Sequence, residues 1–311
     1  MWRSSRALFD VATAVDCGDR DNQEDAVVAD FPIGETCGLA VLADGMGGHG
    51  NGDIASSIVA TEVFAELRVR RRAFTGRESE ISNHLRQAAD EANSALQLHV
   101  EANPKARGMG TTLIATVLAG PHLYWLSVGD SPLYLYRKGE IERLNEDHSM
   151  APHIDAMVAS GQLSVELAEN HPERNTLTSA ISGEKIARID CPEKPFALQE
   201  SDILIVSSDG LQSLRDGEIN RILRRNRKRS SAEIAEELLD AVEALKMPGQ
   251  DNTSVTVIKM LSGAAAVPEP VAIPEEWVSV RAKPAEGEAT EIFDAVELDE
   301  SPIALPKRAV G

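Results

Sequence analysis

Four aspartates stand where buried apolar runs meet glycine or small polar residues. Three of them close a run: Asp44 in VLADG, Asp130 in SVGDS and Asp209 in IVSSDG. The fourth, Asp251, comes just before the run TSVTVIKM. Carboxylates at strand ends can converge on one edge of a sheet core, where they repel one another unless they are protonated or bridged by cations. Oxygen ligands select hard cations such as Mg²⁺ or Mn²⁺. Taken singly, each aspartate could instead be a helix cap or a turn residue.

Asp44 also opens the stretch richest in glycine, LADGMGGHGNGD. Glycines let the backbone approach a ligand closely, because they carry no Cβ atom. By itself such a stretch could hold a metal, a phosphate or nothing. The remaining acids and the basic residues of the chain decide between these possibilities.

A polar segment between the first two predicted strands carries Arg20 and the acidic pair Glu24-Asp25. The planar guanidinium of an arginine matches two phosphate oxygens, so Arg20 beside a metal cluster is a candidate phosphate ligand. A surface salt bridge between Arg20 and Glu24 is the alternative.

Motifs for other phosphate and hydrolase chemistries are missing from the sequence. No cysteine is followed six residues later by arginine, and neither GxxxxGK[ST] nor HExxH occurs. Asp19-Arg20-Asp21 resembles an aspartyl-nucleophile motif, but no apolar strand leads into it.

The elements that must position these residues follow from hydrophobic periodicity. Helices are predicted after the glycines from Ile54, through Ile81–Leu96, at 164–170, and twice after Gly210, the second with Ile234 and Leu245. Residues 150–183 indicate an inserted flap. Short turns between neighbouring strands favour antiparallel pairing. The predicted strands are 8–15, 26–31, 38–43, 112–119, 122–129, 132–144 with a hairpin at Lys138-Gly139, 203–206 and 253–260.

Charge and composition limit the classes of partner. The 311 residues carry a formal charge of −19, which argues against nucleic-acid or anionic-membrane binding. Two basic clusters, 68–72 and 221–229, are expected to be solvated helix faces, with docking of acidic partners as the alternative. From residue 262 onward Pro, Ala and Glu dominate and periodicity is lost, so 262–311 is predicted to be a disordered acidic tail after a catalytic domain, 1–261.

Three cysteines without a CxxC pair imply no disulfide framework. There is no signal-peptide pattern and no run near ~18 apolar residues, so a cytoplasmic protein without membrane insertion is expected. We also expect a monomer.

Seven segments, in order, resemble the metal-dependent serine/threonine protein phosphatases, the PPM or type 2C family. The DGMGG form is similar to the bacterial branch of that family. The resemblance covers about residues 6–260 and implies an α+β fold, an αββα sandwich of two antiparallel sheets flanked by helices. The seven segments are RDNQEDAVVAD, LADGMGGHGNGDIAS, GMGTTLIATVL, LSVGDSPLYLYRKGEIERLNEDHS, HPERNTLTSAI, DILIVSSDGLQSL and DNTSVTVI.

The resemblance also implies roles for individual residues. Asp44 would bridge two metal ions, Mn²⁺ or Mg²⁺, and Gly45 would offer its backbone carbonyl to one of them. Asp209 and Asp251 would complete the first metal's ligands, and Asp130 would bind a third ion with Asp209 shared. Glu24 and Asp25 would lie near the metals, partly through waters, and Arg20 would hold the substrate phosphate.

The implied reaction is a single-step hydrolysis of phosphoserine and phosphothreonine in proteins, opposing a Ser/Thr kinase. A hydroxide formed from a water that bridges two cations would attack phosphorus in line with the leaving oxygen. Partners would be phosphorylated proteins, including a cognate kinase or its substrates, and those of the partner-switching type are a further possibility. The alternative is a catalytically silent regulator with this fold that binds phosphoproteins.

The sequence departs from the family pattern at three places. Met46 stands where several members carry a histidine that can act as general acid, so a metal-bound water is the remaining candidate proton donor. His49 should not inherit that role, and His148 is interpreted as structural. Pro132 follows GDS where arginine is common, and the spacing between Gly18 and Arg20 is one residue shorter than usual.

Overall fold

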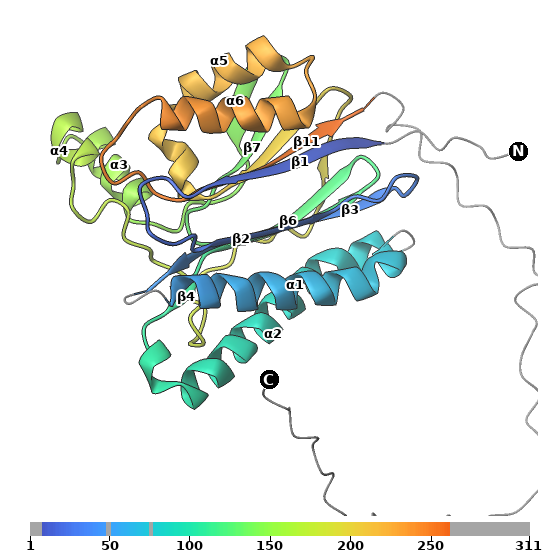
Figure 1. Cartoon of the computed structure of the whole chain (residues 1–311), viewed down its shortest axis with the longest axis horizontal. Coiled ribbons are helices and arrows are strands. Elements are labelled where there is room, and N and C mark those ends of the chain that lie inside the picture. Colours follow the sequence, from blue (N-terminus) through green and yellow to red (C-terminus); the bar gives the residue numbers. More distant parts are fainter. Residues whose placement is uncertain (1–7, 48–50, 75–76, 262–311) are drawn as a thin grey trace, which may run out of the picture. The chain divides into compact units, whose positions relative to one another are not determined.

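Two antiparallel β-sheets lie face to face in this computed structural model, which describes residues 8–47, 51–74 and 77–261 (Figure 1). Over these residues the first sheet has the strand order β1-β11-β10-β7-β8 and the second β2-β3-β5-β6-β9, with β4 paired to β3. Helices cover the outer face of each sheet, as the αββα resemblance implies. The predictions for His49 and for the tail 262–311 lie outside the described residues.

The first sheet joins both ends of the described chain. Its strands, in spatial order, are β1 (Phe9–Asp16), β11 (Thr253–Met260), β10 (Ile203–Ser207), β7 (Leu133–Arg137) and β8 (Glu140–Arg143). Helices α5 (Asp216–Asn226) and α6 (Ser231–Glu243) pack on its outer face.

The second sheet carries Asp44. Its strands are β2 (Asp25–Asp30), β3 (Cys37–Met46), β5 (Leu113–Ala119), β6 (His122–Val128) and β9 (Phe196–Ala197), with β4 (Gly110–Thr111) beside β3. Helices α1 (Gly52–Phe74) and α2 (Ile81–Ala102) cover it, and short 3₁₀ turns lie at Glu78–Glu80 and Pro104–Ala106.

Strand β3 is buried on both faces, because it lies between a helix layer and the opposite sheet. Successive side chains of a strand point to opposite faces. Leu39 and Val41 accordingly pack toward α1 and α2, whereas Ala40 and Leu42 pack into the core between the sheets. This double burial explains why the run before Asp44 is continuously apolar rather than alternating.

The chain crosses from one sheet to the other between β6 and β7. The hairpins β5–β6 and β7–β8 pair as predicted. The expectation that strands joined by short turns pair with each other is wrong between β6 and β7, because these two strands belong to different sheets. Gly129 (φ +102°) begins the crossing segment, Gly129–Pro132, and Asp130 lies within it. The short turn seen in the sequence is therefore a bridge between layers.

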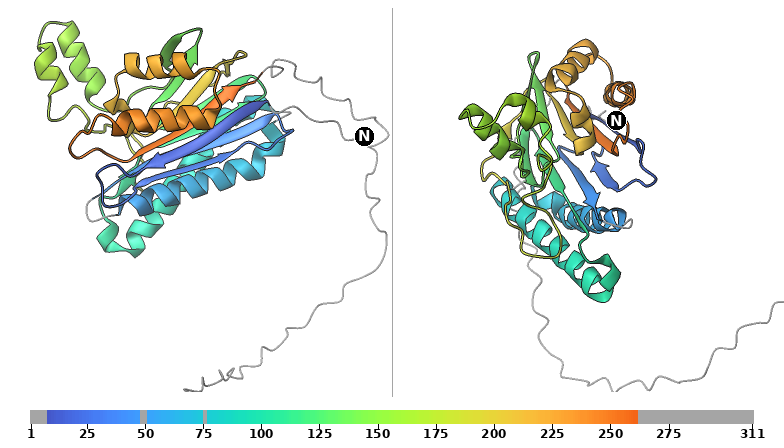
Figure 2. Two further views of the ribbon diagram at one scale, coloured as in Figure 1. Left: turned by 45° about the horizontal axis from the view of Figure 1, so that its top comes forward. Right: turned by 90° about the vertical axis from the view of Figure 1, so that its left-hand side faces the viewer.

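The flap contains two short helices rather than the one that was predicted. Helix α3 (Ala151–Ala159) precedes α4 (Val165–Glu169), whose start is capped by the Ser164 hydroxyl, which accepts the amide of Leu167. Figures 1 and 2 show both helices projecting from one end of the sandwich. Among the described helices, none has the length and apolar character needed to cross a bilayer.

The two basic clusters differ in their surroundings. Residues 221–229 expose their arginine and lysine side chains, as expected. Arg71 contradicts the expectation for the 68–72 cluster: it is only 9% exposed and its guanidinium pairs with Asp30 (2.8 Å) and Glu35 (3.2 Å). A buried arginine is tolerated there because carboxylates from the end of β2 and from the loop that follows it compensate its charge.

Candidate active site

One cleft of about 480 Å³ lies at the end of the sandwich where the predicted acids converge. Strands from both sheets end there, which explains why residues so distant in sequence meet. The cleft is lined by Arg20, Glu24, Asp44, Gly45, Met46, Thr112, Asp130, Asn175, Leu177, Asp209, Asp251 and Asn252, among others. Asp25 is the one predicted site residue that lies behind this lining rather than in it. Thus the four strand-end aspartates do share a site.

Asp44 is held by the backbone of its own sheet. Its amide donates to Thr112 Oγ1 (3.1 Å), and its carbonyl accepts the Thr112 amide (2.9 Å). The amide of Asp209, from the other sheet, lies 3.5 Å from Asp44 Oδ2. Next to it, a Cβ at Gly45 would lie 2.1 Å from the Gly52 carbonyl oxygen, so this position admits only glycine. The start of α1 therefore packs directly under the Asp44-Gly45 peptide.

Asp25 faces Asp44 across the β2–β3 pair and contacts the opposite sheet. The Ser208 hydroxyl donates to Asp25 Oδ2 at 2.7 Å, and the Ser254 amide in turn donates to Ser208 Oγ at 2.9 Å. The side chain is thus fixed from both sheets. Its position beneath the cleft is compatible with contact to bound ions through water.

Asn252 organises the loops around Glu24 and Asp251. Its side-chain oxygen accepts the Glu24 amide (2.7 Å), and its side-chain amide donates to the carbonyls of Cys17 (2.9 Å) and Asn22 (3.0 Å). Its own backbone amide donates to Asp251 Oδ1 (2.8 Å). A single buried amide side chain, 4% exposed, therefore ties the loop after β1 to the loop before β11.

Asp209 begins a 3₁₀ turn, Asp209–Ser213, directly after β10. The next residue, Gly210, packs against the backbone before β11, where an added Cβ would lie 2.1 Å from the Asn252 carbonyl oxygen. This close approach brings the ends of β10 and β11 together. It sets Asp209 and Asp251 on the same side of the cleft.

Burial and mutual repulsion raise the pKa values of the clustered acids. Burial is the main cause at Asp44, whose pKa is raised well above 3.8, and the charge of Asp209 adds to it. Burial, followed by the charge of Asp130, raises the pKa of Asp209 to about 7. At Asp130 burial, with the charge of Asp147, raises the pKa to about 6. Burial also raises the pKa values of Glu24 and Asp25.

Arg20 lies at the rim and pairs with a predicted metal ligand. Its Nη2 lies 2.6 Å from Asp251 Oδ2, and both side chains are about half exposed, at 53% and 45%. The sequence left open a salt bridge between Arg20 and Glu24; in the structure Arg20 pairs with Asp251 instead. Backbone bonds from Asp19 to Gln250 (2.9 Å) and from Arg20 to Cys17 (3.3 Å) hold its loop in place. The guanidinium is thus available at the mouth of the cleft.

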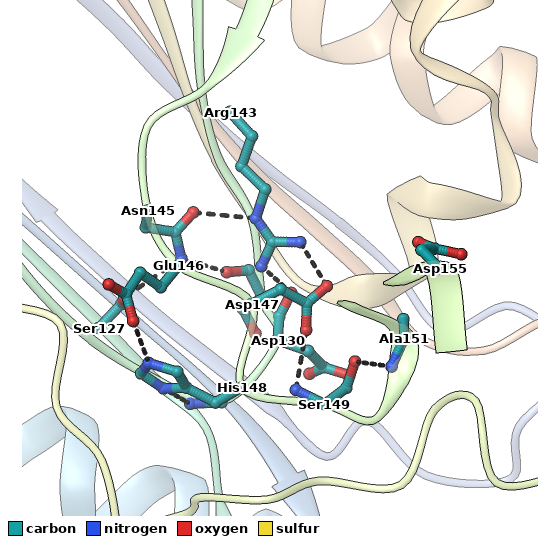
Figure 3. Close-up of polar contacts among 12 residues, drawn as sticks. Ser127, Asp130, Arg143, Asn145, Glu146, Asp147, His148, Ser149, Ala151 and Asp155 are labelled. Atoms are coloured by element: carbon teal, nitrogen blue, oxygen red, sulfur yellow. Dashed lines mark hydrogen bonds and ion pairs between the residues drawn. The ribbon is translucent and has the colours of Figure 1, made fainter. Parts of the chain in front are cut away.

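Asp130 lies in the segment that crosses between the sheets, and its side chain is 8% exposed. Figure 3 shows the polar contacts behind it, in which Arg143 donates to its carbonyl oxygen at 2.7 Å. His148 is fully buried nearby, and its Nδ1 accepts the Gly129 amide at 3.3 Å. This contact agrees with the structural role predicted for His148.

The donor set fits a hard divalent cation. Carboxylates predominate among the charged side chains that line the cleft, and the raised pKa values of Asp44, Asp130 and Asp209 reflect burial together with a concentration of negative charge that a cation would neutralise. Within the described ranges no three acidic, histidine or cysteine side chains surround a single point closely enough to hold an ion unaided. Carbonyl oxygens such as that of Gly45, together with waters, would complete the coordination, as is usual for Mg²⁺ and Mn²⁺.

Sequence reasoning missed the polar residues that support the acids. Thr112, Ser208 and Asn252 each bond the backbone or side chain of a predicted site residue. All three stand inside segments that carry the family resemblance: GMGTTLIATVL, DILIVSSDGLQSL and DNTSVTVI. Their roles depend on partners up to 228 residues away, which no local pattern reveals.

Fold and site together define the class: a metal-dependent phosphatase with an αββα core. The model of the protein phosphatase 2C family matches residues 19–248, so the chain belongs to that family. The serine/threonine phosphatase Stp of Listeria monocytogenes is 34% identical over 222 residues, covering 71% of this chain and 84% of that protein. The chain is accordingly a metal-dependent serine/threonine protein phosphatase of the bacterial type, which confirms the predicted resemblance.

Solved structures show the same architecture. The crystal structure of the serine/threonine phosphatase PstP/Ppp from Mycobacterium tuberculosis superimposes with a TM-score of 0.68 at 31% identity, covering 81% of this chain and 99% of that one. The PstP catalytic domain in complex with two manganese ions has a TM-score of 0.64 at 30% identity, with 81% and 98% covered. The sequence of the serine/threonine protein phosphatase PstP of Mycobacterium tuberculosis is 29% identical to this chain. The match covers 94% of this chain and 49% of PstP.

Proposed function

We propose that this chain hydrolyses phosphoserine and phosphothreonine in proteins and so opposes a Ser/Thr protein kinase. The observation that carries the proposal is the convergence of four strand-end aspartates on one cleft, with an arginine at its mouth. The Stp and PstP relatives are named serine/threonine phosphatases, which supports the same substrate class.

The proposed ligands are those to which the resemblance points. Asp44 would bridge two ions, with the Gly45 carbonyl, Asp209 and Asp251 as further ligands; Asp130 would serve a third. Mn²⁺ or Mg²⁺ bound there would lower the pKa of a coordinated water and so supply the nucleophile at neutral pH. Bound cations would also keep the buried carboxylates ionised, because they offset the burial and the mutual repulsion that raise the pKa values of these groups.

The chain's own groups then bind and orient the phosphate. To bind substrate, the Arg20 guanidinium would release the Asp251 oxygen with which it pairs and turn toward the phosphate. There its planar fork can donate to two phosphate oxygens. Glu24 and Asp25 are fixed by Asn252 and Ser208 and would orient waters at the floor of the cleft. Met46, 36% exposed at the lining, carries no transferable proton.

The leaving oxygen therefore needs a proton from an acid or a water in the cleft. No histidine occurs among the described residues that line it. This distinguishes the chain from the family members that carry histidine after the Asp-Gly pair. A histidine acting as general acid must be protonated, so the pH–rate profile is expected to lack the alkaline limb that a titrating imidazole would give.

Phosphate release from a phosphothreonine peptide tests the proposal. Turnover should require Mn²⁺ or Mg²⁺ and disappear when a chelator is added. Replacing residues that support metal ligands typically lowers activity roughly 10- to 100-fold. Because Asp44 is itself a proposed ligand, Asp44→Asn should lower turnover by more than that. Asp240→Asn, at an exposed position of α6 that does not line the cleft, is the control and should keep full activity. A purified chain that binds Mn²⁺ and the phosphopeptide without turnover would instead support the silent regulator.

A further inference from the structure

The guanidinium of Arg143 bonds three different acceptors behind Asp130 (Figure 3). Nη2 donates to the Asp130 carbonyl (2.7 Å), Nη1 to Asp147 Oδ2 (2.9 Å) and Nε to Asn145 Oδ1 (3.2 Å). The side chain is 19% exposed, so these bonds lie mostly away from bulk water. Arg143 is the last residue of β8; it does not line the cleft that holds all four aspartates, but it lines an adjoining groove that shares Asp130, Asp209 and Asp251 with that cleft.

Neighbours of Arg143 hold the rest of the crossing segment. The His148 amide donates to the Gly129 carbonyl (3.0 Å), and Asn145 Nδ2 donates to the Ser131 carbonyl (3.0 Å). Each of the three carbonyls from residue 129 to residue 131 thus receives a donor from the segment 143–148. The backbone around Asp130 cannot shift without breaking at least one of these bonds, which are strong because they are shielded from water.

The same segment also begins the flap. Asp147 Oδ1 accepts the Ser149 amide (2.9 Å), and Ser149 Oγ accepts the amide of Ala151, the first residue of α3 (3.1 Å). Arg143 and Asp147 line a groove of about 1040 Å³ that also includes Asp130 and flap residues such as Arg174. The Arg143–Asp147 pair therefore connects the Asp130 segment with the start of the flap.

We propose that Arg143 is a positioning residue: it holds Asp130 in the geometry needed for metal binding and couples this segment to the start of the flap. The metal part rests on the proposed function, in which Asp130 is a ligand. A lysine cannot replace the arginine fully, because one ammonium cannot reach all three acceptors as the planar fork does.

Calorimetric titration of the metal-free full chain with Mn²⁺ provides the first test. Asp130→Asn identifies the binding step to which Asp130 contributes. Arg143→Gln should weaken that same step by about 10- to 100-fold, the range typical of partners behind metal ligands, and Arg143→Lys by less. The other binding steps should be unchanged.

Amide hydrogen exchange provides a second readout that needs neither metal nor turnover. In Arg143→Gln, exchange should accelerate at Gly129–Ser131 and at Ser149–Ala151 together. The control is Arg137→Gln, at the other end of the β7–β8 hairpin. The Arg137 guanidinium likewise bonds a carboxylate, Asp202 (2.7 Å), and a carbonyl, Ala197 (2.9 Å). This control should lower the unfolding temperature while leaving both the Mn²⁺ titration and the exchange near Asp130 as in the wild type.

Two results would overturn the inference. One is an Arg143→Gln chain with wild-type Mn²⁺ binding and unchanged exchange at 129–131. The other is an equal loss in Arg143→Gln and Arg137→Gln, which would indicate general destabilisation. If Arg143→Gln does not fold, Arg143→Lys decides by the same criteria. A wild-type chain that shows the expected exchange and Mn²⁺ behaviour but hydrolyses no phosphopeptide would refute the proposed function and leave the positioning role standing.

Discussion

The hydroxyl groups of Thr112 and Ser131 lie 2.7 Å apart, and through this contact the two sheets are joined beneath the cleft. Thr112 Oγ1 also accepts the Asp44 amide, so its own hydrogen is free to go to Ser131. Ser131 directly follows Asp130 in the crossing segment. One pair of hydroxyls therefore connects the strand end that carries Asp44 with the crossing segment that carries Asp130.

Replacing Thr112 with valine should damage both stability and activity. The change keeps the shape but leaves the partly buried Asp44 amide without its acceptor, which costs about 1–3 kcal/mol in the free energy of unfolding. Because the Asp44 and Asp130 backbones are then free to separate, kcat for a phosphopeptide should also fall. Thr116→Val is the control: Thr116 lies in β5 of the same sheet, and its hydroxyl donates to the Ala40 carbonyl (3.2 Å). It should lose stability and keep kcat; an equal kcat loss in both variants would contradict this account.

Without metal, the protein should become less stable as pH rises from about 4 to about 7. The pKa values of Asp130 and Asp209 are raised to about 6 and about 7 in the folded chain, against 3.8 as the ordinary value. In this window the folded state binds more protons than the unfolded state, so the free energy of unfolding falls with pH. Asp44, whose pKa is raised in the same sense, adds to the slope.

Thermal unfolding in chelator, measured at several pH values, checks this pH dependence. Saturating Mn²⁺ should reduce or reverse the slope, because bound cations favour the ionised carboxylates and bind the folded chain alone. Asp209→Asn should flatten the slope in chelator. A melting temperature that rises steadily from pH 4 to pH 7 in the metal-free chain would be incompatible with the arrangement described.

Gly210→Ala should be far more harmful than Gly217→Ala. A Cβ at Gly210 would lie 2.1 Å from the carbonyl oxygen of Asn252, and a backbone atom cannot move aside as a flexible side chain can. Asp209 and Asp251 would be pushed apart, so both Mn²⁺ affinity and kcat should drop. At Gly217, in the first turn of α5, a Cβ meets nothing within 4 Å, so alanine should be neutral or add up to about 1 kcal/mol of stability. Paired thermal melts and Mn²⁺ titrations measure the difference.

Arg20→Ala should raise KM for a phosphopeptide while scarcely changing the melting temperature. The Arg20–Asp251 pair is half exposed, and exposed pairs contribute about 0–1 kcal/mol to stability. If the guanidinium binds the phosphate, its loss should weaken substrate binding by about tenfold or more, in line with 1.5–3 kcal/mol for a charged hydrogen bond. Arg229→Ala, which removes an exposed pair with Glu237 (2.7 Å), is the control and should leave KM unchanged. An unaltered KM in Arg20→Ala would exclude the phosphate role.

Much of the architecture could be predicted because local patterns encode element type. The continuous apolar run before Asp44, the strand-forming run 253–260 and the helical spacing of 81–96 each reflect burial that a single element requires. The seven motifs, through their resemblance to the phosphatase family, predicted the αββα arrangement. The two sheets and their flanking helices confirm that prediction. The bounds of β11, Thr253–Met260, agree with the prediction to the residue.

The amino-acid sequence by itself determined which residues could do chemistry: four strand-end aspartates and an arginine in an oxygen-rich, metal-binding pattern. Only the tertiary structure decided that the chain changes sheets at Gly129–Pro132, that Arg20 pairs with Asp251 rather than Glu24, and that Arg143 holds the Asp130 segment. The physical reason is the range of the interactions. Periodicity reports whether a residue is buried, whereas the partner of a buried polar group is set by which layers pack together, over separations that a local pattern cannot record.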